Sequence, residues 1–180
     1  MTFQEMMQFR EPEQPVMNAA NAVNNAFLWA NRALDTTKEA VWIDFGLPFT
    51  SQFIHEIAHI NLKRLDAFGD ILHENHLKQT YPATPSLDEV IGDMDKVFEI
   101  VVTIIDEVDE ALNNFIKAAN GGHSNAMALA AETLQMENSA DRTKVLQAWK
   151  MWSTGVANTS FDNWILHLMD HNGEADESDD

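Results

Sequence analysis

Residues 53–76 read "FIHEIAHINLKRLDAFGDILHENH", and this stretch decides both the fold class and the candidate site. Its apolar residues recur every three or four positions, which is the period of an amphipathic α-helix. We predict one long helix from about Pro48 to His76, whose buried stripe contains Ile54, Ile57, Ala58, Leu65, Phe68 and Leu72. The same stretch holds four histidines among several carboxylates, so it is the first place to search for a metal site.

The helical period continues on both sides of this stretch. One further helix follows Pro15, one ends at the "NGG" of residues 120–122, one runs from Ser124 to about Ser153, and a short one lies near 161–170. Their inward positions are predicted to be Val16, Ala20, Val23, Phe27, Ala30 and Leu34; Val97, Ile100, Val101, Ile104, Val108, Leu112 and Phe115; and Met127, Ala131, Leu134, Val145, Trp149 and Trp152. Four long amphipathic helices with no alternating β pattern predict an all-α four-helix bundle. Trp29 also falls at core spacing.

The chain is predicted to divide into four parts. These are an N-terminal extension (1–15), the four-helix bundle (16–155), a short C-terminal helix (156–171) and an acidic tail (172–180). Residues 77–85, "LKQTYPATP", contain two prolines and are expected to be extended. Ser86 and Glu89 have capping-box spacing. If these residues begin a separate short helix, the link between the second and third long helices crosses the length of the bundle. We favour this crossover topology. If they open the long third helix, the bundle runs up-down-up-down.

Composition excludes several classes of protein. The sequence has no cysteine, so disulfides, zinc–thiolate sites and thiol nucleophiles are absent. It shows no signal-peptide pattern and no apolar run long enough to cross a membrane, so we expect a cytoplasmic protein. Eleven Lys and Arg against twenty-nine Asp and Glu give a net charge of −18, which disfavours nucleic acid as a partner and is compatible with metal cations.

Two metal-site interpretations of the opening stretch are weak. "HEIAH" at residues 55–59 has the H-E-x-x-H spacing of zinc proteases, but no predicted strand offers an edge to align a peptide. Glu56 and His59 also form the E-x-x-H unit of di-iron bundles. That site needs a second E-x-x-H, and Glu132 and Glu137 have no histidine three residues later. His73, His76 and His123 are expected on solvated surfaces.

A third pattern lies further along the same helix. Asp70 and Glu74 are four residues apart, so both carboxylates project from one side of the helix with a rise of about 6 Å. His55 lies fifteen residues before Asp70, which is about 22 Å along the axis. These residues can share a metal only between two chains, across a two-fold axis that pairs the helices antiparallel.

The residues from Thr37 to Glu74, and more loosely 16–155, resemble the Dps family of mini-ferritins. The resemblance rests on Trp42, Gly46 and Phe49 in "VWIDFGLPF", on His55 in "IHE", and on Asp70 and Glu74 in "DILHE". It implies a ferritin-like bundle in a homo-oligomer, expected to be a dodecamer built from two-fold dimers. It also implies a ferroxidase that oxidises Fe(II) with peroxide or oxygen, stores iron and protects against oxidative stress. Zinc is a possible competitor for the iron.

The sequence departs from the Dps pattern in one ligand. Val41 stands where the family carries its first histidine, which leaves His55, Asp70 and Glu74 as the expected catalytic and metal-binding residues, with His59 and Asp66 as further metal ligands. The alternative function is a ferritin-like oligomeric metal-binding or structural protein with degenerate ferroxidase activity. The family's basic DNA-binding extension is absent, so no direct DNA binding is expected.

Overall fold

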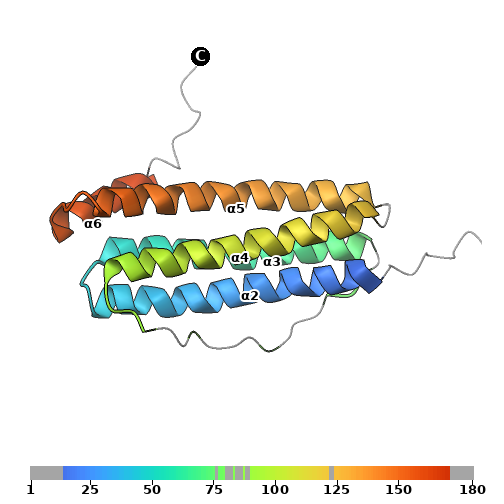
Figure 1. The fold of residues 1–180 in the computed structure, drawn as a ribbon, viewed down its shortest axis with the longest axis horizontal. Coiled ribbons are helices and arrows are strands. Elements are labelled where there is room, and N and C mark those ends of the chain that lie inside the picture. Colours follow the sequence, from blue (N-terminus) through green and yellow to red (C-terminus); the bar gives the residue numbers. More distant parts are fainter. Residues whose placement is uncertain are drawn as a thin grey trace, which may run out of the picture.

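The computed structural model describes residues 14–75, 77–79, 83, 87, 90–121 and 124–170. Over these residues the chain forms helices and no strand (Figure 1). Four long helices lie side by side, and a short one covers one end of them. The helices are α2 (Gln14–Ile43), α3 (Pro48–Glu74), α4 (Met94–Gly121), α5 (Asn125–Trp152) and α6 (Asn158–Asp170). The predicted all-α four-helix bundle with a short C-terminal helix is therefore confirmed.

The helices run in a crossover topology rather than up-down-up-down. α2 and α3 are antiparallel, α4 runs in the same direction as α3, and α5 runs back beside α4 (Figure 1). The link between α3 and α4 therefore joins opposite ends of the bundle, as we favoured from the sequence. Asp93 caps α4, because its Oδ1 accepts a hydrogen bond from the Lys96 amide at 2.8 Å. Ser86 and Glu89, where a capping box was predicted, lie outside the described residues.

The break between α2 and α3 follows from two residues. Gly46 has a φ of 66°, in the left-handed region that glycine adopts without steric cost. Pro48 then opens α3, where its missing amide hydrogen is not needed and its fixed φ suits the helix. The turn brings Ser51 back to α2, so that its hydroxyl donates to the Lys38 carbonyl at 2.9 Å. This local geometry places the start of α3 beside the end of α2.

The core is built from the predicted apolar stripes. Every residue of the stripe expected in α3 is buried, as are the predicted inward residues of α2 and α4. Phe68 of α3 and Phe115 of α4 meet edge to face with ring centroids 4.9 Å apart. Burial of large apolar side chains is the main stabilising term for such a bundle, at about 25 cal/mol per Å² of apolar surface.

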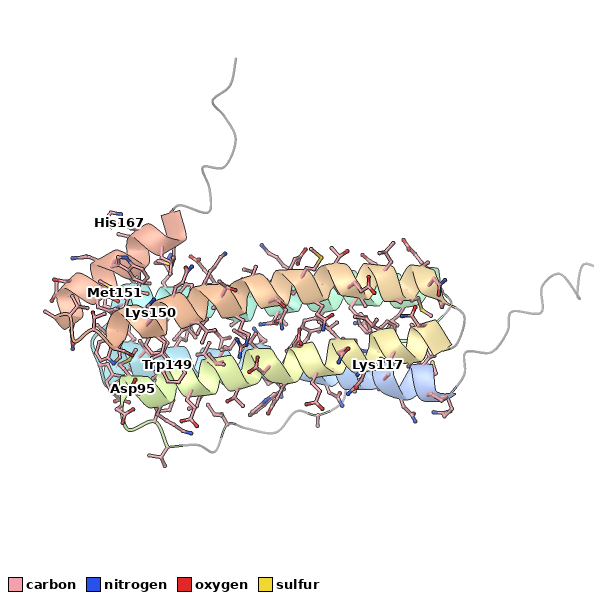
Figure 2. The ribbon with its side chains drawn as sticks, turned by 45° about the horizontal axis from the view of Figure 1, so that its top comes forward. Asp95, Lys117, Trp149, Lys150, Met151 and His167 are labelled. Carbon is pink, nitrogen blue, oxygen red and sulfur yellow. The ribbon has the colours of Figure 1, made fainter. Side chains whose placement is uncertain are left out.

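The tryptophans lie at the edge of this core. Trp29, Trp149 and Trp152 are half-buried, with their rings packed against core residues. The indole N–H of Trp149 donates to Asp95 at 2.7 Å, and both residues lie at the end of the bundle near α6 (Figure 2). Trp29 donates in the same way to Glu107 at 3.0 Å. The predicted core role is confirmed, with the polar edge of two of the rings satisfied by surface carboxylates.

Two contacts fix the ends of α3. At its start, Phe161 and Ile165 of α6 are fully buried and Asp162 hydrogen-bonds to Thr50. Toward its end, Gln79 lies directly over Gly69, where any Cβ would collide with the Gln79 side chain. Gln79 Nε2 donates to the Leu65 carbonyl at 3.2 Å. A larger residue at position 69 would therefore require the flexible Gln79 side chain to move.

No helix in the described part of the chain is both long enough and apolar enough to cross a bilayer. α3 and α4 are amphipathic, each with one apolar stripe and an outward polar face.

Candidate functional site on the outer face of α3

The predicted site residues share one side of α3. We define the outer face of α3 as Gln52, His55, Glu56, His59, Lys63, Asp66, Asp70, His73 and Glu74. At 3.6 residues per turn these positions fall within an arc of about 100°. All are exposed except His55, which is half-buried. The bundle therefore leaves this histidine- and carboxylate-rich surface uncovered in the single chain.

Within one chain the predicted ligands do not come together. His55 and Asp70 are separated by fifteen residues of continuous helix, a rise of about 22 Å. Among the described residues, no group of three or more histidine and acidic side chains is placed to hold a metal ion. His59 and Asp66 lie between the two ends, on the same exposed face. Any shared coordination by His55, Asp70 and Glu74 requires a second copy of the chain.

His55 is held in a defined environment by α2. Its Nδ1 lies 2.9 Å from Oδ1 of Asp35, which is in α2. Its ring packs edge to face against His59, with centroids 4.3 Å apart and planes at 85°. Lys38 Nζ lies 3.8 Å from the same Asp35 oxygen. His55 therefore has a fixed carboxylate partner, which the sequence did not reveal because Asp35 lies in another helix.

A surface pocket of about 600 Å³ opens beside His55. α2 lines one side of it with Lys38, Glu39, Trp42 and Ile43, and α3 lines the other with residues that include Gln52 and His55. Trp42 is 58% exposed and Ile43 is 72% exposed, which is unusual for large apolar side chains. The pocket therefore has an apolar edge beside the His55 imidazole, together with the positive charge of Lys38 and the negative charge of Glu39.

Val41 does not face this pocket. Its side chain is 0% exposed and belongs to the core. The position that matches the first histidine of the Dps pattern is therefore a packing position in this chain. A histidine at this position would enter the core and could not join the outer face of α3. The burial of residue 41 therefore accounts for the absence of this ligand from the candidate site.

The inward-facing di-iron arrangement is absent from the residues that the structure describes. Glu56 and His59, the E-x-x-H pair, are exposed, and so are Glu132 and Glu137 of α5. Ferritin-like di-iron bundles project these ligand types inward from all four helices. The sequence predicts that this set is incomplete, and in the described structure these four side chains lie on the surface.

The bundle buries several polar side chains that sequence reasoning missed. We define the interior polar cluster as Asn24, Asn61, Arg64, Asn138 and Asp141, all of them buried. Asn61 lies at the midpoint of α3 and Asn138 close to the midpoint of α5. Asn138 donates to the Ile105 carbonyl at 2.9 Å, and Asn61 donates to the Ile57 carbonyl at 2.9 Å.

Arg64 and Asp141 of this set form a buried ion pair. Arg64 Nη2 lies 2.8 Å from Asp141 Oδ2, and the two side chains are only 6% and 7% exposed. Arg64 Nε also donates to Glu137 at 3.3 Å. The buried guanidinium disfavours a metal cation at this point of the interior. The sequence did contain a signal for this burial. Arg64 follows Ile57 by seven residues and Asn61 by three, which places it on the same inward side of the helix.

The remaining histidines considered in the sequence lie either at the surface or outside the described residues. His73 is exposed, as expected, whereas His76 and His123 lie outside the described residues. The zinc-protease interpretation of "HEIAH" gains no support, because the described residues include no strand that would align a peptide. The N-terminal extension up to residue 13 and the tail from residue 171 also lie outside the description.

Comparison with known proteins identifies the class of fold. No protein-family model matches the chain, and no curated protein matches its sequence. Among solved structures, the crystal structure of M. penetrans ferritin is similar, with a TM-score of 0.78 over 86% of this chain and 96% of that chain. The two sequences are 11% identical. The bundle, with its crossover and short terminal helix, is therefore a ferritin-like fold.

Proposed function

We propose that this chain is the subunit of a mini-ferritin-like homo-oligomer that binds and oxidises Fe(II) at sites shared between two copies. One observation carries the proposal: His55, Asp70 and Glu74 lie on one side of α3, and no other helix of the described structure covers them. The expectation came from the Dps resemblance, and the ferritin-like fold supports it. The buried Arg64–Asp141 pair supports it as well, because a guanidinium disfavours a metal cation beside it in the interior.

Antiparallel pairing of two α3 helices brings the separated residues into one site. Lys63 lies about midway between His55 and the Asp70–Glu74 pair, so a two-fold axis near Lys63 places His55 of one copy beside the carboxylates of the other. Each dimer then contains two equivalent sites. The carboxyl-terminal half of the face is the more acidic, and a bound cation offsets the repulsion between its carboxylates.

The proposed ligands suit iron as substrate. Two carboxylates and one imidazole form an oxygen-rich set that binds Fe(II) and stabilises Fe(III), although zinc also binds such a set. Two Fe(II) ions give one electron each to hydrogen peroxide, and with two protons the products are two Fe(III) and two waters. Oxygen is the other candidate oxidant. A closed oligomer, a dodecamer by the Dps resemblance, would keep the Fe(III) product as a mineral store.

The test compares two double variants. Asp70→Ala/Glu74→Ala removes two carboxylates from the outer face of α3, and Glu110→Ala/Glu132→Ala removes two exposed carboxylates from α4 and α5. Fe(II) oxidation, followed by the absorbance of the Fe(III) product, is expected to be lost only in the first variant. Circular dichroism checks that both remain folded. Equal oxidation rates in the two variants and the wild type would overturn the assignment.

The second candidate function is an oligomeric metal-binding or structural protein with weak oxidation. Val41 favours it, because the fold places this position in the core and so offers no second histidine to the site. Under this function the wild type binds zinc and Fe(II) through the same residues but oxidises Fe(II) no faster than the Asp70→Ala/Glu74→Ala variant. Metal titration and oxidation rates on the same samples separate the two.

A further inference from the structure

The contact between Asp35 and His55 joins two helices at the proposed site. Asp35 lies in the last third of α2, and its Oδ1 is 2.9 Å from Nδ1 of His55 in α3. A carboxylate oxygen can only accept a hydrogen bond, so the Nδ1 atom of His55 must carry the proton. The lone pair of the neutral imidazole is then on Nε2. No hydrogen bond reaches Nε2 from the residues that the structure describes.

We infer that Asp35 is a positioning residue that holds His55 in the Nδ1–H tautomer and so makes Nε2 its metal-binding atom. The inference rests on the proposed function, in which His55 supplies the nitrogen ligand. Histidines that bind metals commonly donate their other ring N–H to a carboxylate, which fixes the ring and raises the basicity of the ligating nitrogen. Asp35 therefore extends the site to α2, a helix from which we predicted no ligand.

The surroundings of Asp35 hold this arrangement in place. Lys38 Nζ approaches the same carboxylate oxygen at 3.8 Å and lies 3.3 Å from Glu39 Oε1. The His59 ring packs edge to face against the His55 ring, with the planes at 85°. The imidazole thus contacts Asp35 at one nitrogen and packs against the ring of His59. Both His55 and Lys38 also line the surface pocket beside Trp42.

The first experiment reads the tautomer directly in the metal-free protein. Long-range proton–nitrogen NMR of histidine-labelled protein at alkaline pH distinguishes Nδ1–H from Nε2–H, and His55→Gln assigns the signal. We expect Nδ1–H in the wild type and loss of that preference in Asp35→Leu. Asp35→Asn should retain it, because the amide oxygen still accepts a hydrogen bond. Asp44→Leu, an exposed aspartate near the end of α2, is the matched control.

The second experiment measures zinc binding by calorimetry on the same proteins. Loss of an outer carboxylate partner commonly lowers metal affinity about 10–100-fold, so we expect a decrease of this size in Asp35→Leu and none in Asp44→Leu. Zinc should also shift the Nε2 signal of His55. An Nε2–H tautomer in the wild type, or equal zinc affinity in Asp35→Leu, overturns the inference.

The two experiments also separate this inference from the proposed function. A wild type that binds no zinc and no Fe(II) overturns the function and the ligand role of His55. In that case the NMR result still decides whether Asp35 fixes the ring, because it is obtained without metal. Wild-type binding that is unaffected by Asp35→Leu leaves the function standing and removes Asp35 from it.

Discussion

Asp162 in α6 caps the start of α3 through Thr50, although the two residues are 112 positions apart in the sequence. Its Oδ1 accepts a hydrogen bond from the Thr50 amide at 2.8 Å and another from the Thr50 hydroxyl at 2.7 Å. Its Oδ2 accepts one from the Phe49 amide at 3.1 Å. The first amides of a helix lack partners within the helix, and Leu47 at the N-cap provides no side-chain cap. α6 therefore completes the turn that precedes His55.

Asp162→Ala is expected to destabilise the protein by about 1–3 kcal/mol, because it leaves buried donors without acceptors. Urea unfolding followed by circular dichroism measures the change. Asn163→Ala, at the exposed neighbouring position of α6, is the control and should change stability by less than about 0.5 kcal/mol. Similar values for the two variants would show that the cap contributes little to stability.

Arg64→Met is expected to cost more, about 3–5 kcal/mol, because it leaves the carboxylate of Asp141 buried without its partner. Replacing both members of the pair, as Arg64→Met/Asp141→Leu, should recover much of that loss, since apolar side chains of similar volume can replace a buried ion pair. Urea unfolding of the single and double variants gives both values. A double variant less stable than Arg64→Met would contradict this account of the cluster.

The neighbouring residue provides the control for this prediction. Arg142 also pairs with an aspartate, Asp106, at 2.6 Å, but the two side chains are 41% and 48% exposed. Solvent screens this pair, so Arg142→Met should cost less than about 1 kcal/mol. A loss in Arg64→Met no larger than the loss in Arg142→Met would mean that burial of the pair has no energetic consequence.

Self-association through α3 gives a third prediction. Lys63 is the lone Lys or Arg on the outer face of α3 as defined above, and it lies near the proposed two-fold axis. In the proposed dimer this surface faces the acidic residues of a second copy, so the negative charge that Lys63→Glu adds should weaken association. Light scattering after size exclusion is expected to show a smaller species than the wild type at equal concentration. Like-charge contacts at an interface cost several kcal/mol.

Lys117→Glu makes the same charge change on α4, away from the proposed interface (Figure 2). It should leave the size of the oligomer unchanged. If both variants dissociate to the same extent, total charge rather than the outer face of α3 controls assembly. If the wild type is itself a monomer at micromolar concentration with zinc present, the shared-site proposal fails.

The bundle could be predicted from the sequence because its signals are local. Apolar periodicity in α3 and α4 and the break at Gly46 each depend on residues within a few turns. The crossover was the favoured of two topologies that the prolines and the capping signal after α3 left open. What could not be predicted are contacts between elements, such as Asp162 with Thr50 and Asp35 with His55. Spacing along one helix carries no information about which residue of another helix lies opposite.

The candidate site was predicted in part for the same reason. His55, Asp70 and Glu74 share one face of one helix, so helical geometry alone placed them on a common surface. Arg64 was not predicted to be buried, because it lies beside the apolar stripe of Leu65 and Phe68 and charged side chains are rarely buried. The role of Val41 also needed the structure, since the sequence shows a missing histidine but not that the position is buried.

The last prediction is that the protein does not bind duplex DNA at about 0.15 M salt, where charges are screened beyond about 8 Å. Phosphate binding needs several Lys or Arg presented together. The first fifteen residues, "MTFQEMMQFREPEQP", contain one Arg and three Glu, and the last ten, "HNGEADESDD", contain no Lys or Arg. Their composition provides no basic arm in any conformation, and the net charge of −18 adds repulsion.

A gel-shift titration with duplex DNA tests this, with a variant that carries a lysine-rich N-terminal extension as the positive control. We expect a shifted band for the extended variant and none for the wild type. A tight wild-type complex would mean that the folded surface gathers several of its few Lys and Arg into a basic patch. If the wild type does not bind, the proposed function would protect DNA only by consuming Fe(II) and peroxide in solution, because the protein would not coat the duplex.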